Sequence, residues 1–394
     1  MLVLDGLRAI AICMVMVHHY TQSIPKSGLG DRYFHGIANS CWIGVDLFFV
    51  LSGFLITGIL YDAKGSPSYF RTFYIRRSLR IFPIYYMLLL VVFMILPALH
   101  LSIVDPFTLS HARWFWLYGA NYFTGLVSWP DRAVVHLWSL AIEEHFYLLW
   151  PVIVFIASKR QLLIGGAVFL FVAIGMRYYA ATHGTSSTSI YVMTHYRIDT
   201  LVMGGLLALC WKTPDLRATL IRHSGKAAIL FLLVMVVWLV STQGLDWTSW
   251  SPAQQAGGYT VIGLFFAAAH VVSLNLPSGA LFYRILTCAP AIWLGQLSYG
   301  MYLFHRPIEI VAIKLGLHPS AHVDVGYPNW PYELAYILGN AAATALVAWI
   351  TWNLFEKHVL RLKDRFIYQN SGMKEPSESR AAPGPLVTDA KMPE

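Results

Sequence analysis

Residues 81–98 read IFPIYYMLLLVVFMILPA and contain no charged side chain. An apolar run of this length is close to the roughly 20 residues that an α-helix needs to cross the hydrocarbon core of a bilayer. The stretch FYIRRSLR at 73–80 comes directly before it, so three arginines stand at one edge of the run. The sequence here predicts a transmembrane helix that begins beside a cluster of positive charge.

Similar apolar runs recur along the whole chain, which is 57% hydrophobic and only 12% charged. A soluble domain has about 25% charged residues, so lipid must be the solvent for most of this chain. We therefore predict an all-α fold, a polytopic membrane helical bundle of about ten transmembrane helices. The predicted spans are 8–24, 38–61, 81–98, 134–157, 161–177, 198–211, 228–243, 257–275, 290–316 and 331–356.

Lysine and arginine indicate how the bundle is oriented, because they gather in cytoplasmic loops. With the N-terminus inside, twelve of them fall in inner loops and only six in outer loops, the six being Lys26, Arg32, Arg113, Arg132, Arg177 and Arg197. We predict that both termini are cytoplasmic. The formal net charge of +8 then reflects topology and contact with anionic lipid headgroups, and no nucleic acid partner is expected.

The composition changes near the end of the chain. From Gln369 onward it is rich in proline, serine, alanine and charge, and such a segment cannot bury a core. We predict a membrane domain over 1–364 and a disordered cytoplasmic tail over 365–394. The first apolar run has no small-residue cleavage pattern after it, so we expect it to be a retained span.

The first span carries a cation and an imidazole on one face. Arg8 and His19 are eleven residues apart, which is three helical turns plus about 20°, at a depth difference of about 16 Å. With this helical spacing, His18 points to a different face of the helix from Arg8 and His19. An imidazole near mid-membrane can take a proton from a hydroxyl, and a cation on the same face can attract an anionic substrate. The alternative is that the histidine only bonds a neighbouring helix.

Arg76, Arg77 and Arg80 lie within one or two turns at the predicted cytoplasmic edge of the third span. Guanidinium groups suit bidentate recognition of phosphate, and coenzyme A carries a pyrophosphate and a 3′-phosphate. These three arginines are candidate residues for binding acyl-coenzyme A. The alternative is a charge cluster that only fixes the topology.

Two further spans carry polar side chains that are costly in lipid. In HLWSLAIEEHFYLLWP at 136–151, Glu143 or Glu144 could orient a catalytic histidine or could pair with one of the arginines. In the ninth span a polar stripe should face the interior. It either lines the path of the acceptor or forms hydrogen bonds between helices. Its members follow helical spacing: Ser298, Tyr302, His305 and Glu309.

Weaker polar and small-residue sites have structural explanations. Asp46, and Asp199 with Arg197, sit near span ends, where ion pairing or helix capping accounts for them. The pairs Ser52-Gly53 and Gly204-Gly205 allow helices to approach closely. The four cysteines form no CxxC pair, so neither a disulfide nor a bound metal is expected.

Six motifs together resemble the acyltransferase-3 family of integral membrane acyltransferases, and they run in order along 4–356. They are LDGLRAIA followed by the two histidines, VDLFFVLSGFLI, RRSLRIFP, HLWSLAIEEHFYLLWP, YRIDTLVMGG and LSYGMYLFH. The resemblance implies a ten-helix, multi-pass enzyme of the bacterial cytoplasmic membrane. Such an enzyme would take an acyl group, above all acetyl, from acyl-coenzyme A and transfer it to a hydroxyl of a carbohydrate or glycosylated acceptor such as a surface polysaccharide, an oligosaccharide or a macrolide sugar.

The resemblance also implies roles for individual residues. The family's Arg-x10-His pattern falls on Arg8 and His19, which would be catalytic, and its Arg-x-x-Arg pattern falls on Arg77 and Arg80, which would hold the donor. His19 would act as general base or would accept the acyl group transiently. The glutamate of the WSLxxE stretch matches Glu143, a third catalytic candidate.

The SYxxYLxH element of the family matches Ser298, Tyr299, Tyr302 and His305, which we assign to the substrate path. The chain departs from the family at His145, where glutamine is frequent, and at Arg306, where an aromatic residue is common. Many relatives carry an additional extracytoplasmic hydrolase-like domain, and we expect this chain to be a stand-alone member without one. The alternative function is a proton-coupled transporter or flippase of a glycan-type substrate, with the same polar residues as a proton relay.

Overall fold

The computed structural model describes residues 2–22, 24, 29–242, 246–319 and 330–368, and all regular secondary structure in these residues is helical. Most of the predicted tail, from residue 369 onward, lies outside the described residues. The long helices are α1 (Leu2–Thr21), α3 (Gly44–Ala63), α4 (Tyr69–Leu90), α9 (Leu137–Ile156), α10 (Lys159–Thr182), α13 (Asp199–Trp211), α14 (Pro214–Thr242), α15 (Pro252–Leu274), α17 (Ala289–Lys314) and α18 (Trp330–Thr351).

Shorter helices connect the long ones. They are α2 (Leu29–Ser40), α5 (Leu96–Ala98), α6 (Pro106–Ser110), α7 (Arg113–Trp116), α8 (Ala120–Leu126), α11 (Ser187–Val192), α12 (Thr194–Arg197), α16 (Leu281–Thr287) and α19 (Lys357–Arg361). Two π-helical turns, Val91–Ile95 and Trp352–Glu356, continue α4 and α18. Residues Leu362–Arg365 form a final 3₁₀ turn.

Each predicted span falls on one of the ten long helices, so the polytopic helical bundle is confirmed. Among the described residues, eight helices are long and apolar enough to cross a membrane. The two that miss these criteria are α13, which has only 13 residues, and α17, which carries Arg306, Glu309 and Lys314. The number ten and the cytoplasmic side of the termini stay predictions.

Local sequence explains where several helices begin. Ser158 accepts from the backbone N–H of Gln161, whose side chain accepts from the backbone of Ser158, and this capping box starts α10. Ser251 and Gln254 form the same arrangement at α15. Both devices satisfy N–H groups that have no partner within the helix. The polar pairs Ser158–Gln161 and Ser251–Gln254 therefore mark where α10 and α15 begin.

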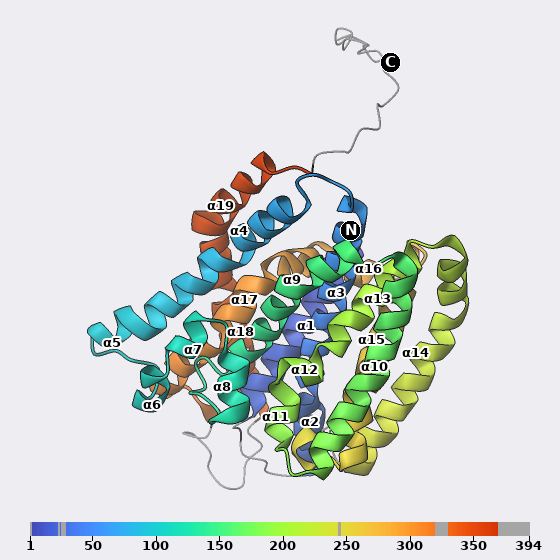
Figure 1. The fold of residues 1–394 in the computed structure, drawn as a ribbon. Coiled ribbons are helices and arrows are strands. Elements are labelled where there is room, and N and C mark those ends of the chain that lie inside the picture. Colours follow the sequence, from blue (N-terminus) through green and yellow to red (C-terminus); the bar gives the residue numbers. More distant parts are fainter. Residues whose placement is uncertain (1, 23, 25–28, 243–245, 320–329, 369–394) are drawn as a thin grey trace, which may run out of the picture.

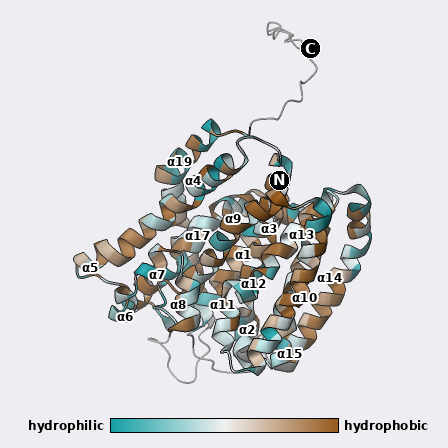
Figure 2. Cartoon of the chain, viewed as in Figure 1, coloured by the Kyte–Doolittle hydropathy of each residue, from teal (hydrophilic) through white to brown (hydrophobic). Residues whose placement is uncertain are grey.

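The centre of the bundle is built on α1, α3 and α17 (Figure 1). Helix α3 packs along α13, and α1 packs along α17, while α10, α14 and α15 form a flank on one side. Apolar side chains cover the outward surface of that flank (Figure 2). Exposed examples on α10 and α14 are Val168, Phe171, Leu230, Val237 and Val240. Such a surface is stable only in contact with lipid or another apolar partner.

Glycine lets α3 and α13 touch backbone to backbone. A Cβ added to Gly53 would lie 1.9 Å from the carbonyl oxygen of Leu201, and one added to Gly204 would lie 2.2 Å from that of Val50. The predicted close approach at these small residues is confirmed. This contact sets how near α3 comes to the helices on the flank.

Two buried ion pairs tie these helices to their neighbours, one linking α12 to α3 and the other linking α10 to α13. Arg197 donates to Asp46 at 2.8 Å and Arg177 to Asp199 at 2.9 Å, and all four side chains have an exposed fraction of 0%. Ion pairing was predicted for Asp46, Asp199 and Arg197, but Asp199 takes Arg177 from α10 as its partner. The assignment of Arg177 to an outer loop is wrong, because it lies inside α10, where Asp199 neutralises it. Arg197 ends the short connecting helix α12 and is neutralised by Asp46.

Replacing Gly204 with alanine is expected to destabilise the bundle, because the new methyl group meets backbone atoms that cannot rotate away. Overpacking of this kind costs about 1–3 kcal/mol. Thermal unfolding of the detergent-purified protein measures the effect as a lower Tm. The control is Gly165→Ala on α10, where a Cβ meets nothing within 4 Å. Equal Tm values for the two variants would contradict the close-contact interpretation.

Candidate active site

Three cavities lie end to end through the centre of the bundle, as their shared walls show. The basic cavity (about 450 Å³) and the middle cavity (about 180 Å³) share six lining residues. These are Arg8, Ile56, Ile59, Arg77, Arg80 and Tyr299. The middle cavity shares Val45 and Tyr302 with the histidine cavity (about 330 Å³), which among the described residues has no wall residue in common with the basic cavity. The path therefore runs from basic to middle to histidine cavity.

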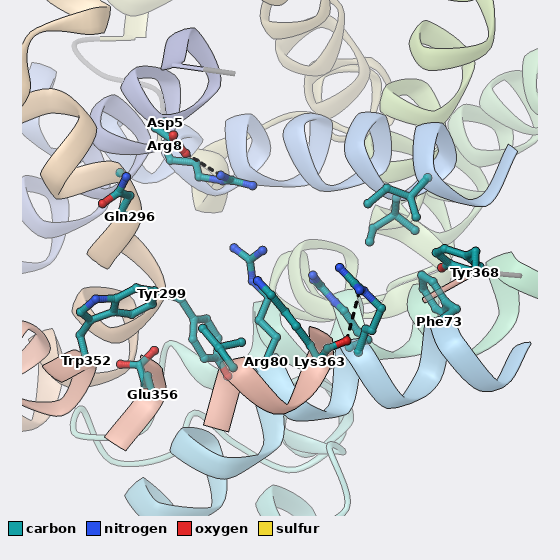
Figure 3. Close-up of a pocket in the computed structure, with 16 residues that line it drawn as sticks. Asp5, Arg8, Phe73, Arg80, Gln296, Tyr299, Trp352, Glu356, Lys363 and Tyr368 are labelled. Atoms are coloured by element: carbon teal, nitrogen blue, oxygen red, sulfur yellow. Dashed lines mark hydrogen bonds and ion pairs between the residues drawn. The ribbon is translucent and has the colours of Figure 1, made fainter. Parts of the chain in front are cut away.

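The basic cavity lies between α1, α4, α17 and the C-terminal helices (Figure 3). Its basic wall residues are Arg8, Arg76, Arg77, Arg80 and Lys363, against the two acidic residues Asp5 and Glu356. Aromatic rings of Phe73, Tyr299, Trp352 and Tyr368 complete the wall. A cavity with this excess of positive charge and several aromatic faces suits an anionic ligand that also carries a flat ring.

The four arginines of this cavity differ in what else they bind. Arg8 pairs with Asp5 at 2.9 Å, and Arg76 donates to the carbonyl oxygens of Lys363 and Phe366 at 3.3 and 2.9 Å. The guanidinium of Arg77 lies 3.7 Å over the ring of Tyr147. Arg80 is exposed and makes no hydrogen bond or ion pair within the described part of the chain. Arg80 is therefore the cation most available to a ligand.

Arg76 has a second task, because its two hydrogen bonds hold the end of the described chain on α4. The packed part of the chain thus continues to Tyr368, past the predicted boundary at 364.

The π-helical turn Trp352–Glu356 directs both of its end residues into the cavity wall. Insertions of this type inside α-helices are frequent at functional sites.

The middle cavity combines apolar side chains, most of them from α3, with three arginines, two glutamates and several hydroxyl groups. Glu143 accepts from Ser52 at 3.0 Å and from Tyr147 at 2.9 Å. Because Arg77 stacks on the same Tyr147 ring, the carboxylate lies in the arginine-bearing part of the site. Within the described residues Glu143 forms no ion pair with an arginine, so its pairing with the cluster stays a prediction. Its hydrogen bonds do not reach His19.

Tyr302 stands between the middle cavity and the histidine cavity. Its hydroxyl donates to the carbonyl oxygen of His136 at 3.0 Å and lies 2.5 Å from Oγ of Ser139. Ser298 lines the middle cavity one turn away. Both residues lie in the walls of the linked cavities, Tyr302 in a wall that two of them share, and their assignment to the substrate path stays a prediction.

The histidine cavity opens at the end of the path farthest from the arginine cluster. His19 and Arg306 lie in its wall with a set of aromatic side chains: Trp42, Trp129, Trp138, Tyr191 and Trp247. Tyr191 and Trp247 are stacked, with ring centroids 4.2 Å apart. Flat apolar faces beside hydrogen-bonding groups are suited to a ligand that is itself ring-shaped and polar at its edges.

His19 is held from behind by a second histidine. Its Nδ1 lies 3.0 Å from Nε2 of His305, whose exposed fraction is 0%. His305 therefore stands behind His19 and outside the walls of all three cavities. His18 lines the same cavity as His19, so the prediction that it points elsewhere is wrong. Two successive residues of α1 therefore line this cavity.

Glu309, a member of the predicted polar stripe, forms an ion pair beside His19 with Arg306, which the sequence did not predict as part of the site. Arg306 also donates to the carbonyl oxygens of Arg132, at 3.0 Å, and His19, at 3.4 Å. The signal was available, because a guanidinium in the middle of an apolar span requires a partner or water. The family comparison alone marks Arg306 as a departure from the aromatic residue that is common at that position.

Comparison with known proteins agrees with this arrangement. A family model described as an acyltransferase domain matches residues 1–352. The chain belongs to the acyltransferase-3 family. It is therefore a multi-pass membrane protein, and the acyltransferase-3 domain covers all three cavities except for the last turns of the C-terminal segment. No solved structure matches it.

Its relatives are bacterial acetyltransferases of about twice the aligned length. The peptidoglycan O-acetyltransferase OatA of Listeria monocytogenes is 28% identical over 399 residues, covering 94% of this chain and 57% of the relative. The putative peptidoglycan O-acetyltransferase YrhL of Bacillus subtilis is 28% identical, covering 90% and 54%. The O-acetyltransferase OatA of Staphylococcus aureus is 28% identical, covering 90% and 56%. The chain thus spans about half the length of these relatives.

The basic and histidine cavities are expected to open on opposite sides of the membrane, because no wall residue is common to them. Cysteine at position 363 or at position 248 (Lys363→Cys, Thr248→Cys) tests this with a membrane-impermeant maleimide, after the four native cysteines, all free thiols, are changed to serine. Thr248 should be labelled in intact cells and Lys363 only after permeabilisation. A Leu230→Cys control on the lipid-facing surface should react from neither side. Labelling of both test positions from one side would contradict the arrangement.

Proposed function

We propose that this protein is an O-acyltransferase that moves an acyl group, above all acetyl, from acyl-coenzyme A to a hydroxyl of a carbohydrate or glycosylated acceptor. The observation that carries the proposal is the position of His19 at the far end of a path that starts at an arginine cluster. A base for a hydroxyl and a site for a phosphorylated donor are the two parts that this reaction needs. The acetyltransferase names of the relatives agree with the reaction type.

The basic cavity is the proposed site for the coenzyme A head. Arg80, which has no protein partner in the described chain, and Arg77 would bind the phosphates, with Arg8 and Lys363 adding positive charge. Guanidinium groups form strong, charge-assisted hydrogen bonds with phosphate oxygens. Trp352 and Phe73 offer flat faces for the adenine ring. Arg76 would shape the cavity by holding the C-terminal segment and would contribute charge from its rim.

The middle cavity is the proposed channel for the pantetheine arm. Its walls combine the apolar side chains of Phe48, Phe49 and Leu55 with polar groups such as Ser298, as an arm of amides and methylenes requires. The thioester at the end of the arm would come to Tyr302, next to His19. Glu143 would keep Arg77 oriented through Tyr147 and Ser52, a supporting role in place of the catalytic one first predicted.

A single base accounts for every proton that moves in the proposed transfer step. Nε2 of His19 takes the proton of the acceptor hydroxyl, and the oxygen attacks the thioester carbonyl carbon. The carbon–sulfur bond then breaks, and the coenzyme A thiolate takes the proton back from His19. The other order, in which His19 first accepts the acyl group and then passes it to the hydroxyl, uses the same atoms.

The histidine cavity is the proposed acceptor site. Its aromatic wall can cover the face of a sugar ring while Gln22, Thr188 and Arg306 offer hydrogen bonds at the edge. Two relatives are named for peptidoglycan, so soluble peptidoglycan fragments are the first acceptors to test. Mass spectrometry of surface glycans and secreted metabolites from a deletion strain would reveal any other acceptor as a missing acyl-sized mass.

Replacing His19 with alanine is expected to lower acyl transfer by at least about 100-fold, because a general base contributes roughly 10²–10⁴-fold. The assay follows release of coenzyme A thiol from acetyl-coenzyme A by protein in nanodiscs, with and without peptidoglycan fragments. Expression and Tm should match those of the wild type.

The same preparation in sealed vesicles distinguishes the transporter alternative. Substrate-stimulated proton movement without thiol release would favour a transporter and contradict the enzyme. Thiol release by His19→Ala at the wild-type rate would remove His19 from the mechanism.

Replacing Arg80 with glutamine is expected to raise the KM for acetyl-coenzyme A about 10-fold or more, with kcat within about twofold. A hydrogen bond to a charged group contributes about 1.5–3 kcal/mol, and 1.4 kcal/mol corresponds to tenfold. S-acetylpantetheine, which has no phosphate, is the control donor, and its KM should not change.

Arg71→Gln is the matched control variant, since Arg71 lies exposed on the same helix and lines none of the three cavities. An equal rise in KM for both donors would show that Arg80 does not read the phosphates.

A further inference from the structure

The hydrogen bonds behind His19 determine which of its nitrogens carries the proton, and this goes beyond the proposed function on which it rests. Nδ1 of His305 lies 2.6 Å from the backbone carbonyl oxygen of Tyr302. A carbonyl oxygen can only accept, so Nδ1 of His305 must carry a hydrogen. In the neutral ring the other nitrogen, Nε2, then has a free lone pair and can only accept.

That lone pair faces His19. The distance from Nε2 of His305 to Nδ1 of His19 is 3.0 Å, so Nδ1 of His19 must donate. A neutral His19 with its hydrogen on Nδ1 has a bare Nε2. We infer that His305 is a positioning residue: it fixes His19 in the tautomer whose Nε2 is free to take a proton from the acceptor hydroxyl.

The surroundings of His305 favour the neutral ring that this chain of bonds requires. Its nearest charged neighbour is Arg306, a cation, and the carboxylate of Glu309 is already paired with that cation. His136 lies against His305, with ring centroids 4.8 Å apart. A second positive charge here would have no counter-ion among the described residues that contact it, which makes an imidazolium at His305 unfavourable.

Pro307 explains why a third histidine belongs to this assembly. Proline has no backbone N–H, so the carbonyl oxygen of Leu303, four residues earlier, loses its usual helical donor. Nε2 of His136 lies 3.2 Å from that oxygen and fills the vacancy. His136 is thereby fixed on α17, and its ring packs against His305. Tyr302 adds a second tie between these helices by donating to the carbonyl oxygen of His136 at 3.0 Å.

The same geometry serves the charged state of His19. When Nε2 takes the proton, the ring becomes an imidazolium, and its Nδ1–H already donates to a lone pair on His305. Hydrogen bonds from a charged donor are about twice as strong as neutral ones. His305 would thus both set the resting tautomer and stabilise the intermediate without touching either substrate. For histidines that ligate metals, removing the partner that orients the ring costs about 10–100-fold in affinity or activity, and we expect a loss of the same order here.

Two variants and one spectrum test the inference. His305→Ala should lower kcat by about 10–100-fold with KM for both substrates within about twofold. His305→Gln should recover most of the rate, because its side-chain carbonyl can accept from Nδ1 of His19.

¹⁵N NMR of histidine-labelled wild type in lipid should show His19 protonated at Nδ1 and bare at Nε2, and His305→Ala should show a tautomer mixture. His270→Ala is the control, since His270 is equally buried and lies outside the assembly on α15.

Each other outcome overturns the inference. Wild-type rates for both His305 variants, or a His19 bare at Nδ1 in the spectrum, would remove the positioning role while leaving the proposed function intact if His19→Ala is inactive. Failure of His305→Gln to recover activity at a wild-type Tm would show that His305 does more than accept a hydrogen bond. Activity in His19→Ala would instead defeat the proposed function itself, and the NMR result would still decide the tautomer.

Discussion

A charge inside a membrane protein must have a partner or water, and this constraint organises the whole bundle. Arg197 with Asp46, Arg177 with Asp199 and Arg306 with Glu309 satisfy it by pairing. The first pair links α12 to α3 and the second links α10 to α13, while α3 and α13 touch through glycine backbones, so charge neutralisation and close packing hold neighbouring contacts. Arg80 satisfies the constraint differently, by standing in an open cavity. An unpaired cation in a cavity is where a mobile anion can bind.

The sequence predicted the framework because helical periodicity is local. Apolar runs located the ten long helices, and the 3.6-residue repeat placed Arg8 and His19 on one face of α1. The structure agrees, since the two residues line linked cavities. The same arithmetic failed for His18, because it fixes an angle about the helix axis but not the width of the cavity that the helix faces.

Contacts between distant segments could not be predicted in the same way. His19 meets His305 across a sequence separation of 286 residues, and nothing in either motif specifies which nitrogen faces the other. Asp199 was expected to pair near its own motif, yet the bundle brings Arg177 from another helix closer. Arg306 was noticed only as an unusual residue. In each case tertiary packing chose among several polar partners that were all chemically acceptable.

Tyr302 joins the two halves of the proposed reaction. It lines both the middle cavity and the histidine cavity, so it stands between the proposed thioester site and the proposed acceptor site. The hydroxyl is held by the carbonyl oxygen of His136 and by Ser139. Each such bond contributes about 0.5–1.5 kcal/mol net, which is small beside the binding energy of a phosphorylated donor. These two contacts fix Tyr302 in the wall that the two cavities share. Because Nε2 of His136 also contacts the Leu303 carbonyl oxygen that Pro307 leaves without a helical donor, Tyr302 and His305, the neighbour of His19, are held by the same turn of α17.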